Sequence, residues 1–146
     1  ISNIKAVENM FTFLGEHYDG NGYIYLVAHN GIRFDFVFFK ELVNNYLLHK
    51  NSELKDIEIF DIYPKIRYID SLDVARKMVP HLYSYSQKNL CKIFNIVQNN
   101  AHRAIGDVED LEKIYITIVN YGINKFKLDK DFIGNTERVY DYIYNI

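Results

Sequence analysis

The length of 146 residues predicts one compact domain rather than two. Nearly half of the residues are apolar, which is the share expected of a packed core and too high for a disordered chain. The 17 lysines and arginines are balanced by 19 aspartates and glutamates, and this net charge of −2 excludes nucleic-acid binding through an overall basic surface. Apolar runs are far shorter than the roughly 20 residues of a membrane helix. The single cysteine, Cys91, cannot form an internal disulfide, which favours an intracellular location.

The first third of the sequence predicts a helix, a strand and a second helix. Apolar residues recur at helical spacing over residues 3–17, and a glycine-rich turn follows them. Residues 23–28 are continuously apolar and rich in strand formers, which predicts a strand buried on both faces of a parallel or mixed sheet. A polar loop over residues 29–31 then leads to a helix over about 35–48.

The middle of the sequence predicts shorter elements. Residues 57–62 are expected to form either a short strand or an insertion, which Pro64 ends. The end of a strand at residues 67–70 leads into a short helix over 72–78. Ser86 is placed to cap a further helix that reaches about residue 94.

The last part of the sequence predicts one long helix and one short helix. The long helix is expected over about residues 104–120, with Gly122 as its stop. Asn135 is expected to cap a final helix that reaches residue 144. Helices that alternate with apolar strands indicate the α/β fold class.

Two aspartates, Asp35 and Asp107, stand at the starts of predicted helices, and each is followed at helical spacing by apolar residues. These residues are Phe38, Phe39 and Leu42 after Asp35, and Leu111, Ile114 and Ile118 after Asp107. An inward carboxylate is costly unless a cation or a donor meets it, so the pair can converge on a metal ion. The alternative is that each carboxylate accepts backbone N–H groups of its own helix, where the helix dipole favours it.

His102 precedes Asp107 by five residues, and five helical steps turn a side chain through about 140°. The two side chains therefore cannot face one point from one regular helix, which places His102 on the loop or irregular turn before it. A histidine in that position is free to act as a base near neutral pH. The alternative, for an isolated histidine, is a surface or structural role.

Four segments together resemble the DEDDh family, which are 3′→5′ exonucleases with a ribonuclease-H-like fold. VAHNGIRFDFVFFKEL (27–42) and AHRAIGDVEDL (101–111) resemble the second and third exonuclease motifs. IDSLDVARKMVP (69–80) is similar to the Asp-Thr-Leu…Ala-Arg segment of the family, and SYSQKNLCKIFNI (84–96) to its Ser-Tyr-x-Leu-x-x-Leu helix. The segments occur in the family's order at ordinary spacing, which makes the set far more specific than any one motif.

The resemblance implies a catalytic centre. Asp35 and Asp107 match metal-binding aspartates, and His102 matches the histidine that takes a proton from the attacking water. Two Mg²⁺ or Mn²⁺ ions, roughly 4 Å apart, would activate that water and stabilise the leaving 3′ oxygen. The products would be nucleoside monophosphates. Glu109 and Asp110 are expected to face solvent or to lie just behind the metal ligands.

The resemblance also implies a substrate-binding set. Asn30 and Phe34 match positions beside the terminal nucleotide, although a core position explains Phe34 equally well, and Arg103 is placed to contact a backbone phosphate. Asp70 is expected to be structural and to tie the sheet to the next helix. The substrate would be the single-stranded 3′ end of DNA, with RNA as an alternative that these motifs do not distinguish.

The sequence departs from the family at its start, where the family carries an Asp-x-Glu motif that supplies two of four metal carboxylates. We therefore expect a ribonuclease-H-like mixed sheet flanked by helices but recorded without its first strands. The expected parts are an incomplete exonuclease-like domain over residues 1–122 and a C-terminal extension over 123–146 that ends in a helix. The sequence Asp56-Ile57-Glu58-Ile59 lies between the second and third motifs, so we expect a surface segment there.

Three functional hypotheses follow from this departure. Two carboxylates are too few ligands for two divalent ions, so the chain is expected to be an exonuclease fragment with little activity alone. Alternatively, a second polypeptide or a second copy supplies the missing strands. The third hypothesis is a non-catalytic nucleic-acid or protein-binding module that keeps the cleft, and the joint presence of Asp35, His102 and Asp107 argues against it.

Overall fold

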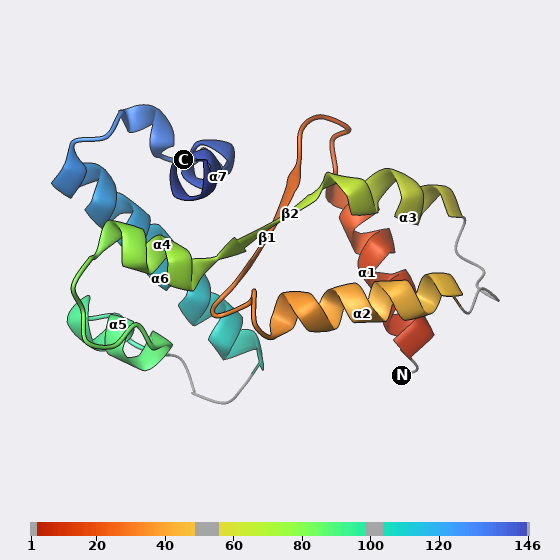
Figure 1. The fold of residues 1–146 in the computed structure, drawn as a ribbon, viewed down its shortest axis with the longest axis horizontal. Coiled ribbons are helices and arrows are strands. Elements are labelled where there is room, and N and C mark those ends of the chain that lie inside the picture. The colour runs from red at the N-terminus through yellow and green to blue at the C-terminus, as the bar shows by residue number, and fades with distance from the viewer. Residues whose placement is uncertain (1–2, 49–55, 99–103, 146) are drawn as a thin grey trace. The chain divides into compact units, whose positions relative to one another are not determined.

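The structure, a computed structural model, describes residues 3–48, 56–98 and 104–145. Contacts group the chain into two compact units, and Figure 1 labels their helices and strands. The first unit comprises Ile1–Leu26 and Gly31–Tyr68, and the second comprises Val27–Asn30 and Ile69–Ile146. Within the described residues, no helix combines the length and apolar character that crossing a bilayer requires.

In the first unit, helix α1 (Asn3–His17) packs against both α2 (Asp35–Leu48) and α3 (Asp56–Ile62). The helices α1 and α2 have the bounds that apolar spacing predicts, because each buries one face. The buried core of this unit consists of Val7, Phe11, Leu14, Phe39, Val43, Tyr46, Ile59, Ile62 and Ile66.

Helix α3 occupies residues 57–62, so the first alternative expected there, a short strand, is wrong, and the second, an insertion, stays a prediction. Ile59 and Ile62 are both buried, and residues three apart share a face of a helix but lie on opposite faces of a strand. Burial of Ile59 also contradicts the expected surface segment at that residue, while the side chains of residues 56–58 lie outside the described structure. Pro64 follows in a short 3₁₀ turn, Tyr63–Lys65.

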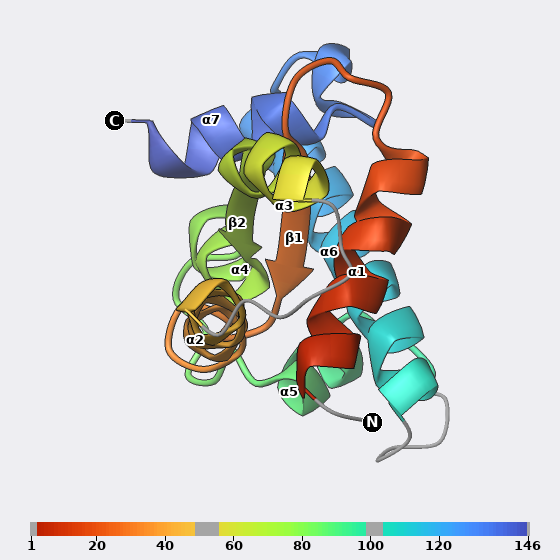
Figure 2. The ribbon, with the colours of Figure 1, turned by 90° about the vertical axis from the view of Figure 1, so that its right-hand side faces the viewer.

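Strands β1 (Ile24–Ala28) and β2 (Ile66–Asp70) form a two-stranded sheet, and their arrows run in the same direction in Figure 2. Parallel strands among helices confirm the predicted α/β class. The expected burial of β1 on both faces is wrong, since Ala28 is buried but residues 24–27 are only partly covered. Within the described residues β1 pairs with β2 alone, so one edge of each strand has no neighbouring strand.

In the second unit, α4 (Ser71–Met78) and α5 (Gln87–Ile93) pack against the long helix α6 (Ala104–Phe126), and α7 (Thr136–Tyr144) packs against α4. Both predicted caps are confirmed. The Ser86 hydroxyl accepts from the N–H of Asn89 at the start of α5, and the Asn135 side chain accepts from the N–H of Arg138 at the start of α7.

Gly122 does not end α6, which continues to Phe126, so the predicted stop is wrong. A β-carbon at Gly122 would collide with the side chain of Met78, because α4 lies close against α6 at this point. The glycine therefore serves close helix packing and not helix termination. The division of the chain after residue 122 into a domain and an extension stays a prediction.

Candidate functional site

The loop between β1 and α2 is anchored at Asn30 by a buried carboxylate. The backbone N–H of Asn30 donates to Oδ1 of Asp70 over 2.8 Å, and Asn30 adopts a left-handed φ of +58° that asparagine tolerates better than most residues. The same oxygen accepts from the N–H of Leu72 over 2.9 Å and caps α4. Asp70 is only 2% exposed. It thus joins the loop to the start of α4, which agrees with the expected structural role.

His29 fastens the same loop through both of its ring nitrogens. Nε2 lies 2.7 Å from the carbonyl oxygen of Tyr85, which can only accept, so Nε2 carries the proton. In the neutral ring, Nδ1 then accepts from the hydroxyl of Ser71 over 2.8 Å. Ser71 is fully buried. Neither His29 nor Ser71 is among the predicted site residues, although a polar residue directly after an apolar strand is a usable signal.

Helix α7 reaches this junction through Tyr144. Its hydroxyl accepts from the backbone N–H of Asp70 over 2.9 Å and donates to Oδ2 of Asp73 over 2.8 Å. Burial, reinforced by the neighbouring carboxylates of Asp73 and Asp70, raises the pKa of Tyr144 above its ordinary value. The hydroxyl therefore keeps its proton and remains a donor across the physiological pH range.

Asp35 is the first residue of α2 and is exposed, which corrects the expectation of an inward carboxylate. Phe38, expected on the inward stripe, is 63% exposed as well. The cause is the actual register of the helix, whose buried face consists of Phe36, Phe39, Val43 and Tyr46. Phe34 is also 63% exposed, so its alternative reading as a core residue is wrong.

Asp107 belongs to the first turn of α6, but its side chain lies outside the described structure. His102 and Arg103 lie outside the described residues altogether. Asp35 belongs to the first unit and Asp107 to the second. The meeting of Asp35, His102 and Asp107 in one site stays a prediction.

Glu109 is exposed, as expected for a residue that faces solvent. Asp110 is only 3% exposed, so it does not face solvent. Burial is the main cause that raises the pKa of the Cys91 thiol on α5, and the charge of Asp110 acts in the same direction. Helix α5 packs against α6, the helix that carries Asp110. Ile114 and Ile118 of α6 are buried as their helical spacing predicts. The same spacing did not predict the burial of Asp110.

The described residues contain no group of three or more His, Cys, Asp or Glu side chains arranged to hold a metal ion. The carboxylate oxygens of Asp35 and Asp107 are the hard donors that Mg²⁺ and Mn²⁺ prefer. Their donor type therefore fits such an ion, but two carboxylates do not make a complete set for two ions.

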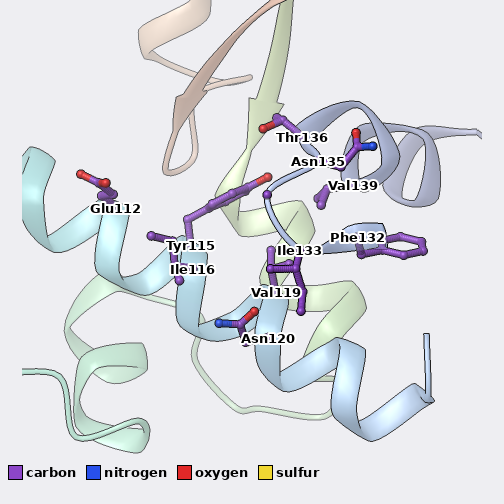
Figure 3. Close-up of a pocket in the computed structure, with 11 residues that line it drawn as sticks. Glu112, Tyr115, Ile116, Val119, Asn120, Phe132, Ile133, Asn135, Thr136 and Val139 are labelled. Carbon is purple, nitrogen blue, oxygen red and sulfur yellow. The ribbon is translucent and has the colours of Figure 1, made fainter. Parts of the chain in front are cut away.

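A cavity of about 410 Å³ lies elsewhere in the second unit, and Figure 3 shows that α6 and the segment leading into α7 line it. None of the predicted site residues lines it. The hydroxyl of Tyr115 is buried and has no hydrogen-bond partner among the described residues, and burial raises its pKa to about 12. A mainly apolar lining with Glu112 as its one carboxylate offers no hydrolytic centre. The lining residues are Glu112, Tyr115, Ile116, Val119, Asn120, Phe132, Ile133, Gly134, Asn135, Thr136 and Val139.

Comparison with known protein families identifies the chain's middle portion with one of them. A family model with the description "Exonuclease" matches residues 17–115 of the chain. No curated protein and no solved structure matches the chain significantly. The matched range contains every residue of the predicted site, namely Asn30, Phe34, Asp35, His102, Arg103 and Asp107.

Proposed function

The chain belongs to the exonuclease family, and from this membership we propose that it carries half of the active site of a DEDDh-type 3′→5′ exonuclease with a ribonuclease-H-like fold. The membership confirms the resemblance drawn from the motifs and implies a nucleic-acid substrate. The observation that supports the finer proposal is that one continuous match, residues 17–115, includes the two aspartates and the histidine that the motif resemblance assigns to the site.

In the proposed site, Asp35 and Asp107 hold divalent cations, Mg²⁺ or Mn²⁺, together with an Asp-x-Glu pair from outside these 146 residues. That pair belongs to a longer stretch of the same polypeptide or to a partner polypeptide. The bound cations would lower the pKa of the attacking water and stabilise the charge that develops on the leaving 3′ oxygen. His102 receives the proton of the attacking water as general base.

Asn30, Phe34 and Arg103 bind the end of the strand in this proposal. The anchoring of the Asn30 backbone by Asp70 supports it, because a fixed loop presents its side chain to a nucleotide with little loss of entropy. The exposure of Phe34 also supports it, since an exposed ring is available to pack against the terminal base. We propose that the enzyme is intracellular and hydrolyses single-stranded DNA, and that RNA is the alternative substrate to be compared in the same assay.

The first test is hydrolysis of a 5′-labelled single-stranded oligonucleotide, with Mg²⁺ or Mn²⁺, by the chain in the longer polypeptide or complex that naturally holds it. We expect a ladder that shortens from the 3′ end and releases nucleoside monophosphates. His102→Ala should lower kcat by roughly 10²–10⁴-fold and leave oligonucleotide binding nearly unchanged. The control His81→Asn changes an exposed histidine whose φ of +72° asparagine accepts, and it should keep full activity.

The second test concerns the metal ligands. Asp107→Asn should raise the Mg²⁺ concentration needed for half-maximal activity and weaken Mn²⁺ binding in a direct titration. Glu109→Gln, which removes an exposed carboxylate from the same helix, should change neither quantity. Tight binding of single-stranded DNA in EDTA, with no cleavage in any divalent metal, would instead establish the non-catalytic binding module.

A further inference from the structure

A second depression of about 410 Å³ lies between α4 and α7 in the second unit. The residues that line it are Asp73, Arg76 and Lys77 of α4 and Ile143 and Tyr144 of α7. We call this depression the α4–α7 groove. It contains none of the residues of the proposed catalytic site.

The charged side chains of the groove are the cations Arg76 and Lys77 and the carboxylate of Asp73. Oδ2 of Asp73 accepts the hydroxyl of Tyr144 over 2.8 Å. Arg76 and Lys77 are both exposed, and within the described part of the chain neither forms an ion pair with a carboxylate. In a chain with a net charge of −2, the groove is therefore a local site of positive charge.

Aromatic rings lie beside both cations. The guanidinium of Arg76 lies 6.0 Å from the ring centroid of Tyr85, and Nζ of Lys77 lies 5.2 Å from that of Tyr142. Cation–π attraction at these distances restrains the two cations without neutralising them. Basic side chains in the last turn of α4 also complement the helix dipole, but that role requires neither a groove nor aromatic neighbours.

We propose that the α4–α7 groove binds a backbone phosphate of a single-stranded nucleic acid. Arg76 supplies the planar fork that suits two phosphate oxygens, and Lys77 supplies a point charge beside it. Ile143 and Tyr144 offer apolar surface to the adjoining sugar or base. The inference rests on the proposed function for its ligand class and adds a contact away from the predicted catalytic residues.

The test is binding of a 5′-fluorescent twelve-nucleotide thymidine strand to the naturally assembled protein in EDTA, measured by anisotropy over a range of salt concentrations. Arg76→Gln combined with Lys77→Gln should weaken binding at least tenfold at low salt. Because the groove binds one phosphate, the double variant should also reduce the slope of log K against log salt by about 0.7. The control Lys125→Gln with Lys130→Gln removes the same charge from exposed positions outside the groove and should change affinity less than twofold.

Two competition arms identify the ligand. Inorganic phosphate and vesicles of anionic phospholipid, each at the phosphate concentration of the strand, should not displace the oligonucleotide. Displacement by either one overturns the assignment to a nucleic-acid strand. Equal affinity of the double variant and the unmodified protein also overturns the proposal.

Failure of this inference is distinguishable from failure of the proposed function. If the double variant binds normally while His102→Ala abolishes hydrolysis, the groove proposal fails and the exonuclease stands. If the double variant loses binding and the unmodified protein cleaves no strand with any divalent metal, the groove proposal stands and the exonuclease proposal fails. Because Arg76 and Lys77 are exposed, an unchanged urea midpoint is expected to verify that the double variant is folded.

Discussion

Different interactions stabilise the interiors of the two units. The core of the first unit is a cluster of rings and aliphatic side chains, in which Phe11 stacks on Phe39 at 6.2 Å between centroids and meets Tyr63 edge-on at 6.1 Å. The second unit also has an apolar core, but it contains a junction of hydrogen-bonded polar groups around the buried side chains of Asp70 and Ser71.

The difference indicates where each unit is sensitive to mutation. Ring packing responds to volume, because a deleted side chain leaves a cavity that its neighbours fill only in part. The polar junction responds to the loss of single hydrogen bonds, because a buried N–H without an acceptor costs about 1–3 kcal/mol. The junction also holds Asn30, so the second unit couples its stability to the conformation of a predicted substrate-binding loop.

The largest effect is expected in the first unit. Phe11→Ala removes a fully buried ring and should lower the free energy of unfolding by about 3–5 kcal/mol, as measured by urea denaturation. Amide exchange should accelerate most in α1, α2 and α3. Phe13→Ala, on the same helix but at a ring that is 58% exposed, should cost less than about 1 kcal/mol. Equal effects of the two variants would contradict the proposed role of ring packing.

The next effect concerns the contact of α4 with α6. Gly122→Ala places a methyl group against Met78 and should destabilise the second unit by about 1–3 kcal/mol, although alanine is intrinsically the better helix former. Gly15→Ala in α1 has no atom within 4 Å of the new methyl group and should stabilise by up to about 1 kcal/mol. Opposite signs in thermal melts are the expected result, and a stabilising Gly122→Ala would refute the packing account.

A smaller effect separates two tyrosine hydroxyls of the second unit. Tyr144→Phe removes an acceptor from the N–H of Asp70 and a donor from Asp73, and it should cost about 1–2 kcal/mol. Tyr115→Phe removes a buried hydroxyl that has no partner among the described residues, so stability should stay constant or rise slightly. Urea midpoints of the two variants measure the contrast. A larger loss for Tyr115→Phe than for Tyr144→Phe would show that the polar junction is not the sensitive point.

The smallest effect is a dependence on alkaline pH. Burial raises the pKa of Tyr68 in the first unit and of Tyr115 in the second to about 12, against an unfolded value of about 10. The folded state therefore holds these protons more tightly, and the associated stability is present below about pH 10 and is lost as the pH rises through about 12. Because both pKa values are raised to about 12, Tyr68→Phe and Tyr115→Phe should each reduce the alkaline fall in the urea midpoint by a similar amount. An alkaline fall that neither substitution reduces would contradict this assignment.

Much of the local structure was predictable from the sequence. Regular apolar spacing located α1 and α2, and the side chains of Ser86 and Asn135 located the starts of α5 and α7, because capping is a local interaction. The second and third exonuclease motifs likewise fall inside the matched range, residues 17–115. These features depend on residues that are neighbours along the chain.

The errors occurred where a distant segment decides the outcome. Ile59 and Ile62 form a helix because α1 covers the face that they share, and Gly122 continues a helix because Met78 lies against it. Asp35 heads an apolar pattern but is exposed, since the register of α2 is set by Phe36 and Phe39. The hydrogen bond of Asn30 to Asp70 joins residues that are 40 positions apart in the sequence, and no local sequence pattern predicts it.

The sequence by itself determined the family, the candidate catalytic residues and the ends of most helices, because motif order, side-chain chemistry and capping are properties of short stretches of chain. Only the tertiary structure decided which faces of those helices are buried and which polar groups anchor the loop at Asn30. The physical reason is that burial and long-range hydrogen bonds depend on which segments approach one another, and hydrophobic burial is not directional enough for one segment to specify its partner.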